Sequence, residues 1–310
     1  MNLALILSSV FFSTTACIFI QKYFISKKKF ALINSRSSHS SIATNSGGIS
    51  VFISIFCISC ILYLNGVEIF DYKIFVPISL MTLIGLYDDL YEIDFKLKLV
   101  FQIIAAKIIV DQGYIITNLH GILGVFELSS MVAQIFTIFI IVSIINSINF
   151  IDGLDGLALT VILIFISSFE FFSKDYFLFD NLSLLLIFSL IPLWYFNFRK
   201  TNKIFLGDSG SLMLGTFVSI YTISILKNDY IIRPEYDIHK ILFVISILFY
   251  PIIDIIRIFS LRIFNGKSPF EADKNHIHHV LLNRSKSHKV TVFIIFSITL
   301  ATIFIIQSIF

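Results

Sequence analysis

Residues 131–157 read MVAQIFTIFIIVSIINSINFIDGLDGL, and this stretch decides the fold. Most of it is apolar, over the length of about 20 residues that a helix needs to cross a membrane. At its end Asn146, Asn149, Asp152 and Asp155 recur at every third position, so a continuing helix would carry them as one polar stripe. Packing between helices explains the asparagines more readily than the aspartates, because a carboxylate in lipid needs a cavity, a partner or a ligand. The stretch therefore predicts a membrane helix that ends at a site.

The composition of the whole chain also indicates a membrane protein. Of the 310 residues 57% are hydrophobic and 14% are charged, and the mean hydropathy is +0.91. A soluble domain has about a quarter of its residues charged. These values exclude a soluble enzyme, a secreted disulfide scaffold and a nucleic-acid-binding protein, and the net charge of +3 is too small to indicate a polyanionic partner. Cys17, Cys57 and Cys60 lie in apolar runs, so we expect no redox or metal role for them.

Ten apolar segments are candidate spans, and they predict an all-α, polytopic helical bundle that forms one integral membrane domain over residues 1–310. The segments are 3–20, 47–64, 72–87, 97–112, 131–149, 157–172, 182–198, 209–226, 240–261 and 290–309. Ten spans place both termini on the same side of the membrane, which we expect to be the outside. The first run has its basic cluster behind it, which is typical of a retained anchor and not of a cleavable signal peptide.

Basic residues are distributed unequally between the two faces that this topology creates. The segments 21–46, 88–98, 150–156, 199–208 and 262–289, with the adjoining span ends, carry 17 of the 23 Lys and Arg residues but only 10 of the 20 acidic residues. This face has a net charge of +7, and the other face has a net charge of −4. Because an excess of Lys and Arg marks the cytoplasmic side, the face with these segments is predicted to be cytoplasmic.

Every dense polar cluster lies on this face. Arg36-Ser-Ser-His39 precedes the pair Gly47-Gly48, although an ordinary loop before a helix explains that pattern better than a binding site does. Asp88 and Asp89 follow an apolar run directly, and adjacent aspartates at a helix end need a metal ion or a cationic partner nearby.

Two further clusters favour phosphate recognition. The sequence Gly207-Asp208-Ser-Gly-Ser211 at a helix start offers backbone N–H groups to a phosphate and a carboxylate to a metal, unless Asp208 or Ser209 simply caps the helix. Downstream, Asp254, Arg257 and Arg262 precede a loop with three histidines. Zinc binding there is conceivable, but the histidines lack thiolate partners, and the surrounding Arg and Lys residues favour an anion instead. These parts suit Mg²⁺-assisted phosphoryl transfer to a lipid.

Four of these motifs, taken in order, resemble those of the polyprenyl-phosphate N-acetylhexosamine-1-phosphate transferases. They are Gly85-Leu-Tyr-Asp88-Asp89, Asn146-x-x-Asn149-x-x-Asp152-Gly-x-Asp155-Gly-Leu, Phe205-Leu-Gly-Asp208-Ser-Gly-Ser and Asp273-x-x-His276-Ile-His278-His279. The resemblance extends from about Arg36 to Leu282. It implies a Mg²⁺-dependent phosphoglycosyltransferase, with Mn²⁺ as a possible substitute, that takes a sugar-1-phosphate from a UDP-N-acetylhexosamine, passes it to undecaprenyl phosphate and releases UMP.

The resemblance also implies roles for individual residues. Asp208 looks like the metal ligand, with Asn149 near the same ion. Asp88, Asp89 and Lys98 match the catalytic positions beside the phosphates, where one aspartate deprotonates or orients the lipid phosphate. Substrate binding is implied for Asn149, Asp152, Asp155, Asn197, Phe205, Arg257, Arg262, His276, His278 and His279. Of these, Asp152, Asp155, Asn197 and Phe205 match a uridine pocket in which Phe205 stacks, and the Arg and His residues resemble a loop that grips the diphosphate and sugar.

Two details refine the resemblance. The family's first cytoplasmic motif has two prolines where this chain has Ile42 and Thr44, which weakens the expected contribution of His39. The string Asn275-His-Ile-His-His lacks the three consecutive histidines of the peptidoglycan translocase branch, so a UDP-GlcNAc-type donor is preferred to UDP-MurNAc-pentapeptide.

The resemblance also implies a location and a pathway. The expected location is the bacterial inner membrane, with the site on the cytoplasmic face, and the expected pathway is O-antigen, lipopolysaccharide or other cell-wall glycan synthesis. A phospho-MurNAc-pentapeptide transferase and a non-catalytic transporter remain alternatives, and the oligomeric state is open.

Overall fold

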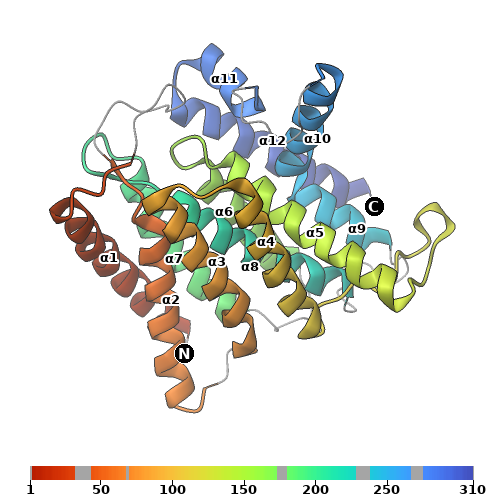
Figure 1. The fold of residues 1–310 in the computed structure, drawn as a ribbon, viewed down its shortest axis with the longest axis horizontal. Helices are drawn as coiled ribbons and strands as arrows, with labels where there is room; N and C mark the ends of the chain where they lie inside the picture. The colour runs from red at the N-terminus through yellow and green to blue at the C-terminus, as the bar shows by residue number, and fades with distance from the viewer. Residues whose placement is uncertain are drawn as a thin grey trace.

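A computed structural model describes residues 2–31, 43–67, 70–172, 180–227, 238–266 and 275–309. Within these ranges the chain is mostly helical, as the apolar runs predict (Figure 1). The helices are α1 (Asn2–Ser26), α2 (Gly47–Leu64), α3 (Phe75–Tyr91), α4 (Phe95–Asp111), α5 (Ser130–Ile151), α6 (Leu157–Phe172), α7 (Asp180–Asn197), α8 (Gly207–Lys227), α9 (Ile238–Ile247), α10 (Phe249–Phe264), α11 (Ile277–Ser285) and α12 (His288–Ile309). Two 3-10 turns, η1 (Tyr72–Ile74) and η2 (Ile122–Gly124), and two short strands, β1 (Ala43–Thr44) and β2 (Lys203–Ile204), complete the described elements.

Six of the described helical stretches are long and apolar enough to cross a membrane by themselves: α1, α2, α3 joined to η1, α5, α8 and α12. The helices α6 and α7 are apolar but shorter. The fold is therefore that of an all-α, polytopic membrane protein. The count of ten spans and the outer position of both termini remain predictions.

The span expected over 240–261 is wrong as a single continuous helix. The chain forms α9 and α10 instead, with a bend of 77° between them. Pro251 lies in the first turn of α10, and it cannot donate a backbone hydrogen bond to the carbonyl group of Ile247 at the end of α9. A missing hydrogen bond and the bulk of the proline ring are the usual causes of a sharp bend in a helix.

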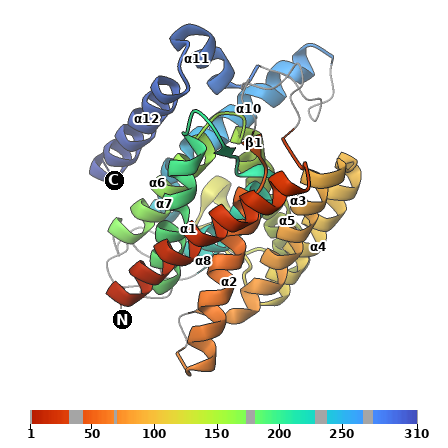
Figure 2. The ribbon, with the colours of Figure 1, turned by 90° about the vertical axis from the view of Figure 1, so that its left-hand side faces the viewer.

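Helix α8 lies at the centre of the bundle, and every residue from Ser209 to Ile225 is buried. It packs against α2, α3, α5, α6 and α9. Small residues such as Gly215 and Ser219 let the neighbouring backbones come close, which is how membrane helices gain packing contacts without a hydrophobic driving force. In Figure 2, α12 lies at the edge of the molecule, and α1 lies in front of α8. The central position of α8 brings its first turn within reach of several helices.

The two strands connect the chain segments that precede α2 and α8. Ala43 and Thr44 pair in parallel with Lys203 and Ile204. The backbone N–H groups of Gly47 and Gly48 then donate to the carbonyl oxygens of Phe205 and Leu206, at 2.9 Å in both cases. As a result, the first turns of α2 and α8 start side by side.

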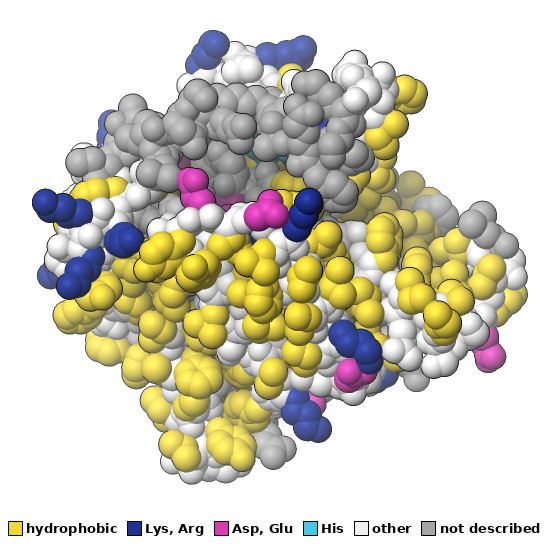
Figure 3. Space-filling model, in the orientation of Figure 1, with side chains coloured by type: hydrophobic (Ala, Val, Ile, Leu, Met, Phe, Trp, Pro, Cys, Tyr) yellow, Lys and Arg dark blue, Asp and Glu magenta, His cyan; other side chains and the backbone are white. Residues whose placement is uncertain are grey.

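The surface has the distribution of polarity that a membrane requires. In the view of Figure 3, hydrophobic side chains form a wide band, and charged side chains lie mainly at its margins. Exposed apolar residues such as Phe11, Leu83 and Phe293 belong to lipid-facing helices, where they need no protein partner.

Candidate active site

Two carboxylates converge on one lysine where the ends of three helices meet. Asp88 lies in the last turn of α3, Lys98 in the first turn of α4 and Asp208 in the first turn of α8. The Lys98 Nζ donates to Asp208 Oδ2 at 2.6 Å and also to Asp88 Oδ2. The Asp88 and Lys98 side chains are only 12% and 14% exposed, whereas Asp208 is 31% exposed. The cluster is therefore partly desolvated, and the Asp208 carboxylate is its most accessible member.

Asn149 joins this cluster from the end of α5. Its Nδ2 donates to Asp208 Oδ1 at 3.0 Å and to the Ser211 hydroxyl at 2.8 Å. One turn earlier, Asn146 exchanges hydrogen bonds with Gln102 of α4, at 3.2 Å and 2.8 Å. Of the two asparagines in the polar stripe, Asn146 thus links α5 to α4 through Gln102, and Asn149 contacts Asp208 in the candidate site.

The donor set at Asp88 and Asp208 fits a hard divalent cation. The two carboxylates already share a positive charge, the Lys98 ammonium group, and Asn149 brings an amide group to the same place. Among the described residues no three His, Cys, Asp or Glu side chains come together as a metal-binding group. Mg²⁺ characteristically takes one or two carboxylates and completes its coordination with water and substrate phosphates. The described residues thus suit Mg²⁺ better than a fully protein-ligated metal such as structural zinc.

Asp89 has a different environment from Asp88. Its Oδ1 accepts hydrogen bonds from the backbone N–H of Asp208 and from Asn45 Nδ2, both at 3.0 Å, and its Oδ2 accepts from the backbone N–H of Ser209 at 2.9 Å. Asp89 therefore caps helix α8 from a neighbouring helix. The sequence-based expectation that these two N–H groups are free for a phosphate is wrong, because the Asp89 carboxylate occupies them.

Glycines allow the helices to approach the first turn of α8. A Cβ atom built on Gly48 would lie 2.0 Å from the Gly210 nitrogen, and one built on Gly85 would lie 2.3 Å from the Asp208 carbonyl oxygen. Neither distance is compatible with a larger residue. The position of Asp208 thus depends on glycines in both α2 and α3.

Asp152 lies just after α5 and has no hydrogen-bond or ion-pair partner for its carboxylate within the described part of the chain. Burial, together with the nearby charges of Asp208, Asp89 and Asp155, raises the pKa of Asp152 well above its ordinary value. A carboxyl group held among like charges is suited to receive a cationic or hydrogen-bond-donating ligand. This position is consistent with the predicted substrate-binding role.

Asp155 and Asn197 have protein partners instead. Asp155 Oδ2 lies 3.1 Å from His288 Nδ1 and forms an ion pair with Lys203. Burial alone would raise the pKa of Asp155, but the hydrogen bonds and charges of His288 and Lys203 hold it below its ordinary value. Asn197 accepts from the Gly156 N–H at 2.5 Å and donates to the Ile204 carbonyl at 2.8 Å. Both side chains thus fix the loop between α5 and α6 to its surroundings.

Three histidines lie at the start of α11, over the same loop. His276 Nδ1 contacts Asp254 Oδ2 at 2.7 Å, and His278 Nδ1 lies 3.0 Å from the Tyr250 hydroxyl, so α10 holds both rings. The His278 Nε2 is buried and has no hydrogen-bond partner among the described residues, and it points toward Gly153. The ring of His279 lies 4.4 Å from that of His278. The structure therefore brings the histidines to the aspartate-rich loop, as the sequence predicts for one shared site.

The remaining predicted residues are placed as follows. The guanidinium group of Arg257 donates to the Asn275 carbonyl, Arg262 is buried in α10, and the backbone of Phe205 bonds to Thr44 and Gly47. Arg36, His39, Ile42 and Asp273 lie outside the described residues. Sequence reasoning missed Asn45, Tyr250 and His288, because single polar residues outside the motifs give no signal of the partner that they meet in the fold.

Comparisons with known proteins decide the family. The sequence model of the family described as "Glycosyl transferase family 4" matches residues 72–226, which contain Asp88, Lys98, Asn149 and Asp208. A protein of Bacillus subtilis (strain 168), named as a probable undecaprenyl-phosphate N-acetylglucosaminyl 1-phosphate transferase, is 35% identical over 271 residues, covering 86% of this chain and 73% of the relative. The chain belongs to glycosyl transferase family 4.

Other relatives extend the comparison. An undecaprenyl-phosphate alpha-N-acetylglucosaminyl 1-phosphate transferase of Pasteurella multocida is 34% identical over 290 residues, covering 89% of this chain and 78% of the relative. A decaprenyl-phosphate N-acetylglucosaminephosphotransferase of Mycobacterium leprae is 34% identical over 105 residues, covering 32% of this chain and 26% of the relative. This glycosyl transferase family 4 chain thus shares most of its length with the Bacillus subtilis and Pasteurella multocida relatives.

Proposed function

We propose that this protein transfers N-acetylglucosamine-1-phosphate, or a closely similar N-acetylhexosamine-1-phosphate, from a UDP-sugar to undecaprenyl phosphate. The relatives that align over most of the chain carry names for this reaction. The observation that carries the proposal is the convergence of Asp88, Lys98 and Asp208 where α3, α4 and α8 meet. Such a cluster supplies what phosphoryl transfer needs, namely charge neutralisation and positioning of phosphates.

The reaction forms one bond and breaks another. An oxygen of the undecaprenyl phosphate bonds to the β-phosphorus of the UDP-sugar, and the bond between this phosphorus and the bridging oxygen breaks, so that UMP leaves with the electron pair. Bound Mg²⁺, or Mn²⁺ in its place, would neutralise the charge of the diphosphate and of the departing UMP. Asp208 and Asp88 would hold the ion, with Asn149 beside it, and the Lys98 ammonium group would face the phosphate oxygens.

The other predicted residues surround this centre. Asp152, whose carboxylate has no partner among the described residues, would contact the nucleotide part of the donor. The contacts of Asp155 and Asn197 would hold the loop that carries Asp152 in place. The His278 Nε2, which has no hydrogen-bond partner within the described part of the chain, would contact the diphosphate or the sugar. The excess of basic residues supports a cytoplasmic site, where nucleotide sugars occur. The product of such a reaction would start a lipid-linked envelope polysaccharide on the bacterial inner membrane.

A donor panel tests this proposal. The purified protein is supplied with undecaprenyl phosphate, Mg²⁺ and a series of UDP-N-acetylhexosamines, and release of UMP is measured. We expect release with UDP-GlcNAc or a close analogue, and its disappearance with EDTA. No release of UMP with any of the donors would refute the proposal.

Asp208→Asn gives a sharper test. The amide keeps the shape of the side chain but removes the charge that would hold the metal, so we expect turnover to fall by about two to three orders of magnitude, as when one preorganised electrostatic group is lost. Asp111→Asn is the matched control, because Asp111 is an exposed aspartate on α4 whose partner is Lys107. Near-normal turnover by Asp208→Asn, with the control also normal, would remove Asp208 from the metal site.

A further inference from the structure

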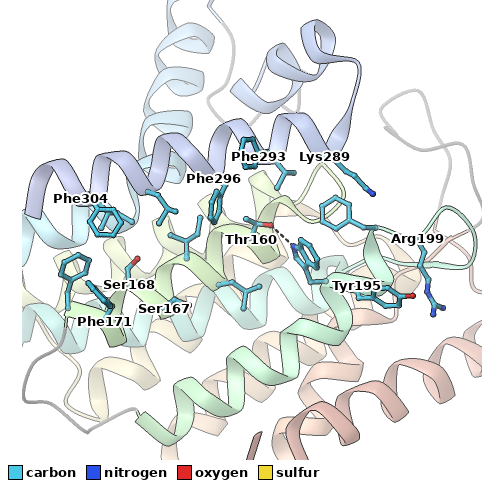
Figure 4. Close-up of a pocket in the computed structure, with 18 residues that line it drawn as sticks. Thr160, Ser167, Ser168, Phe171, Tyr195, Arg199, Lys289, Phe293, Phe296 and Phe304 are labelled. Atoms are coloured by element: carbon cyan, nitrogen blue, oxygen red, sulfur yellow. Dashed lines mark hydrogen bonds between the residues drawn. The ribbon is translucent and has the colours of Figure 1, made fainter. Parts of the chain in front are cut away.

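A large apolar groove opens between α6, α7 and α12 (Figure 4). Its volume is about 1020 Å³, at the upper end of the range of about 300–1,000 Å³ for small-molecule sites. Aromatic and aliphatic side chains line most of it, among them Phe171, Phe293, Phe296 and Phe304. The elements that carry Asp88, Lys98 and Asp208 do not contribute to its lining.

The groove has one cationic end. Arg199, just after α7, and Lys289, in the first turn of α12, both line it, and Figure 4 shows them at the same end, opposite Phe171 and Phe304. The Arg199 guanidinium group lies over the rings of Tyr195 and Phe196, at 5.0 Å and 4.3 Å from their centroids. Within the described part of the chain, neither cation has an acidic partner.

The cationic end lies where α7 ends and α12 begins, next to the segments that lead to the candidate active site. Arg199 is followed closely by β2, which leads into the first turn of α8, and Lys289 follows His288, which contacts Asp155. This end of the groove is therefore on the side of the molecule that carries the excess of basic residues. The apolar part then extends along the membrane-spanning part of α12. A cationic end joined to an apolar channel along the membrane normal matches an amphiphile with an anionic headgroup.

We propose that this groove binds an anionic phospholipid, with its phosphate between Arg199 and Lys289 and its acyl chains between α6, α7 and α12. The charge complementarity selects an anionic headgroup, since nothing else described at that end neutralises the two cations. The site is separate from the one proposed for the polyprenyl acceptor, whose phosphate must reach the helix ends of α3, α4 and α8. The inference does not depend on the transfer reaction.

The chain contains a single tryptophan, Trp194, and it lines this groove. The Trp194 side chain is 39% exposed, and its indole N–H donates to the Thr160 hydroxyl at 3.0 Å. Quenching of its fluorescence by phospholipids with brominated acyl chains thus reports occupation of this groove. The full-length protein in detergent is titrated with brominated phosphatidylglycerol and, separately, with brominated phosphatidylcholine.

We expect the anionic lipid to quench Trp194 at a concentration lower by a factor of about 25, because each of the two basic residues favours an anionic headgroup by a factor of about five. The double variant Arg199→Gln, Lys289→Gln should lose this preference. The control variant Lys22→Gln, Lys28→Gln removes two basic residues at the end of α1, outside the groove, and should keep it.

Three outcomes would overturn the proposal. Equal quenching by the two lipids, or an unchanged preference in the Arg199→Gln, Lys289→Gln variant, would show that the cations do not select the headgroup. Relief of quenching by a low concentration of undecaprenyl phosphate, but not by unlabelled phosphatidylglycerol, would assign the groove to the acceptor. Absence of quenching by either lipid would show that another protein surface, such as a second copy of the chain, covers Trp194.

Discussion

Asp88 and Asp89 are adjacent in sequence but have different contacts, because they point in different directions from the helix that carries them. Successive side chains on an α-helix are separated by about 100° around its axis. Asp88 therefore points to Lys98 and the Asp208 side chain, whereas Asp89 points to the backbone N–H groups of Asp208 and Ser209. Asp88 thus belongs to the cluster proposed to hold the metal ion, whereas Asp89 positions Asp208 through its backbone. The resemblance alone treats the two residues as one catalytic pair.

The difference between the two aspartates predicts different stabilities of their variants. In Asp89→Asn an amide N–H₂ group faces a backbone N–H, and an unsatisfied buried donor costs about 1–3 kcal/mol. In Asp88→Asn, Lys98 keeps its contact with Asp208. We expect the Tm in detergent, followed by differential scanning fluorimetry, to fall clearly for Asp89→Asn and to change less for Asp88→Asn. Equal Tm values for Asp89→Asn and the unmodified protein would contradict the capping role.

At the scale of helices, the site depends on the close approach of α2 and α3 to α8. We expect Gly48→Ala to displace the first turn of α8 and to abolish UMP release, because its methyl group would lie 2.0 Å from the Gly210 nitrogen. Gly66→Ala is the comparison, since nothing lies within 4 Å of a Cβ there and only the backbone cost of the positive φ remains. Measured activity of Gly48→Ala equal to that of Gly66→Ala would show that the contact between α2 and α8 adapts.

Helix α11 contributes a pH dependence to the stability. Burial, with the nearby charge of His279, lowers the pKa of His278 to about 3, whereas an unfolded histidine titrates near 6.5. The unfolded state thus binds more protons between these values, and the free energy of unfolding falls as the pH decreases below about 6.5. We expect the Tm between pH 7.5 and pH 5 to fall more steeply in the unmodified protein than in His278→Asn. Parallel Tm profiles would show that His278 does not contribute.

At the scale of the whole molecule, the asymmetry of charge predicts the orientation in the membrane. Single cysteines are introduced as Lys28→Cys and Glu127→Cys in a variant in which Cys17, Cys57 and Cys60 are replaced by alanine. We expect a membrane-impermeant maleimide to label Glu127→Cys in intact cells and to label Lys28→Cys only after permeabilisation, because an excess of basic residues stays in the cytoplasm. The reverse pattern would place the candidate site on the outer face.

The fold was predictable to the extent that it follows from local apolar runs. The ranges expected for the helices at 131–149 and 209–226 agree closely with α5 and α8, since a helix in lipid must satisfy its own backbone hydrogen bonds. The break between α9 and α10 was missed because a hydropathy profile does not depend on whether a residue, such as Pro251, can donate a backbone hydrogen bond. Residues of the candidate site were predictable where they form motifs, but not where they act singly, as Asn45 and His288 do.

The sequence by itself determined the helical membrane fold, the family and the identity of most polar residues at the site. These depend on composition, on short-range periodicity and on residues close together in the chain. Only the tertiary structure decided that Asp88 and Asp208 share Lys98, that Asp89 caps α8, and that Asp155 binds Lys203 and His288. Each of these contacts joins residues that are distant in sequence, and the direction of a side chain in a packed bundle depends on how neighbouring helices fit together.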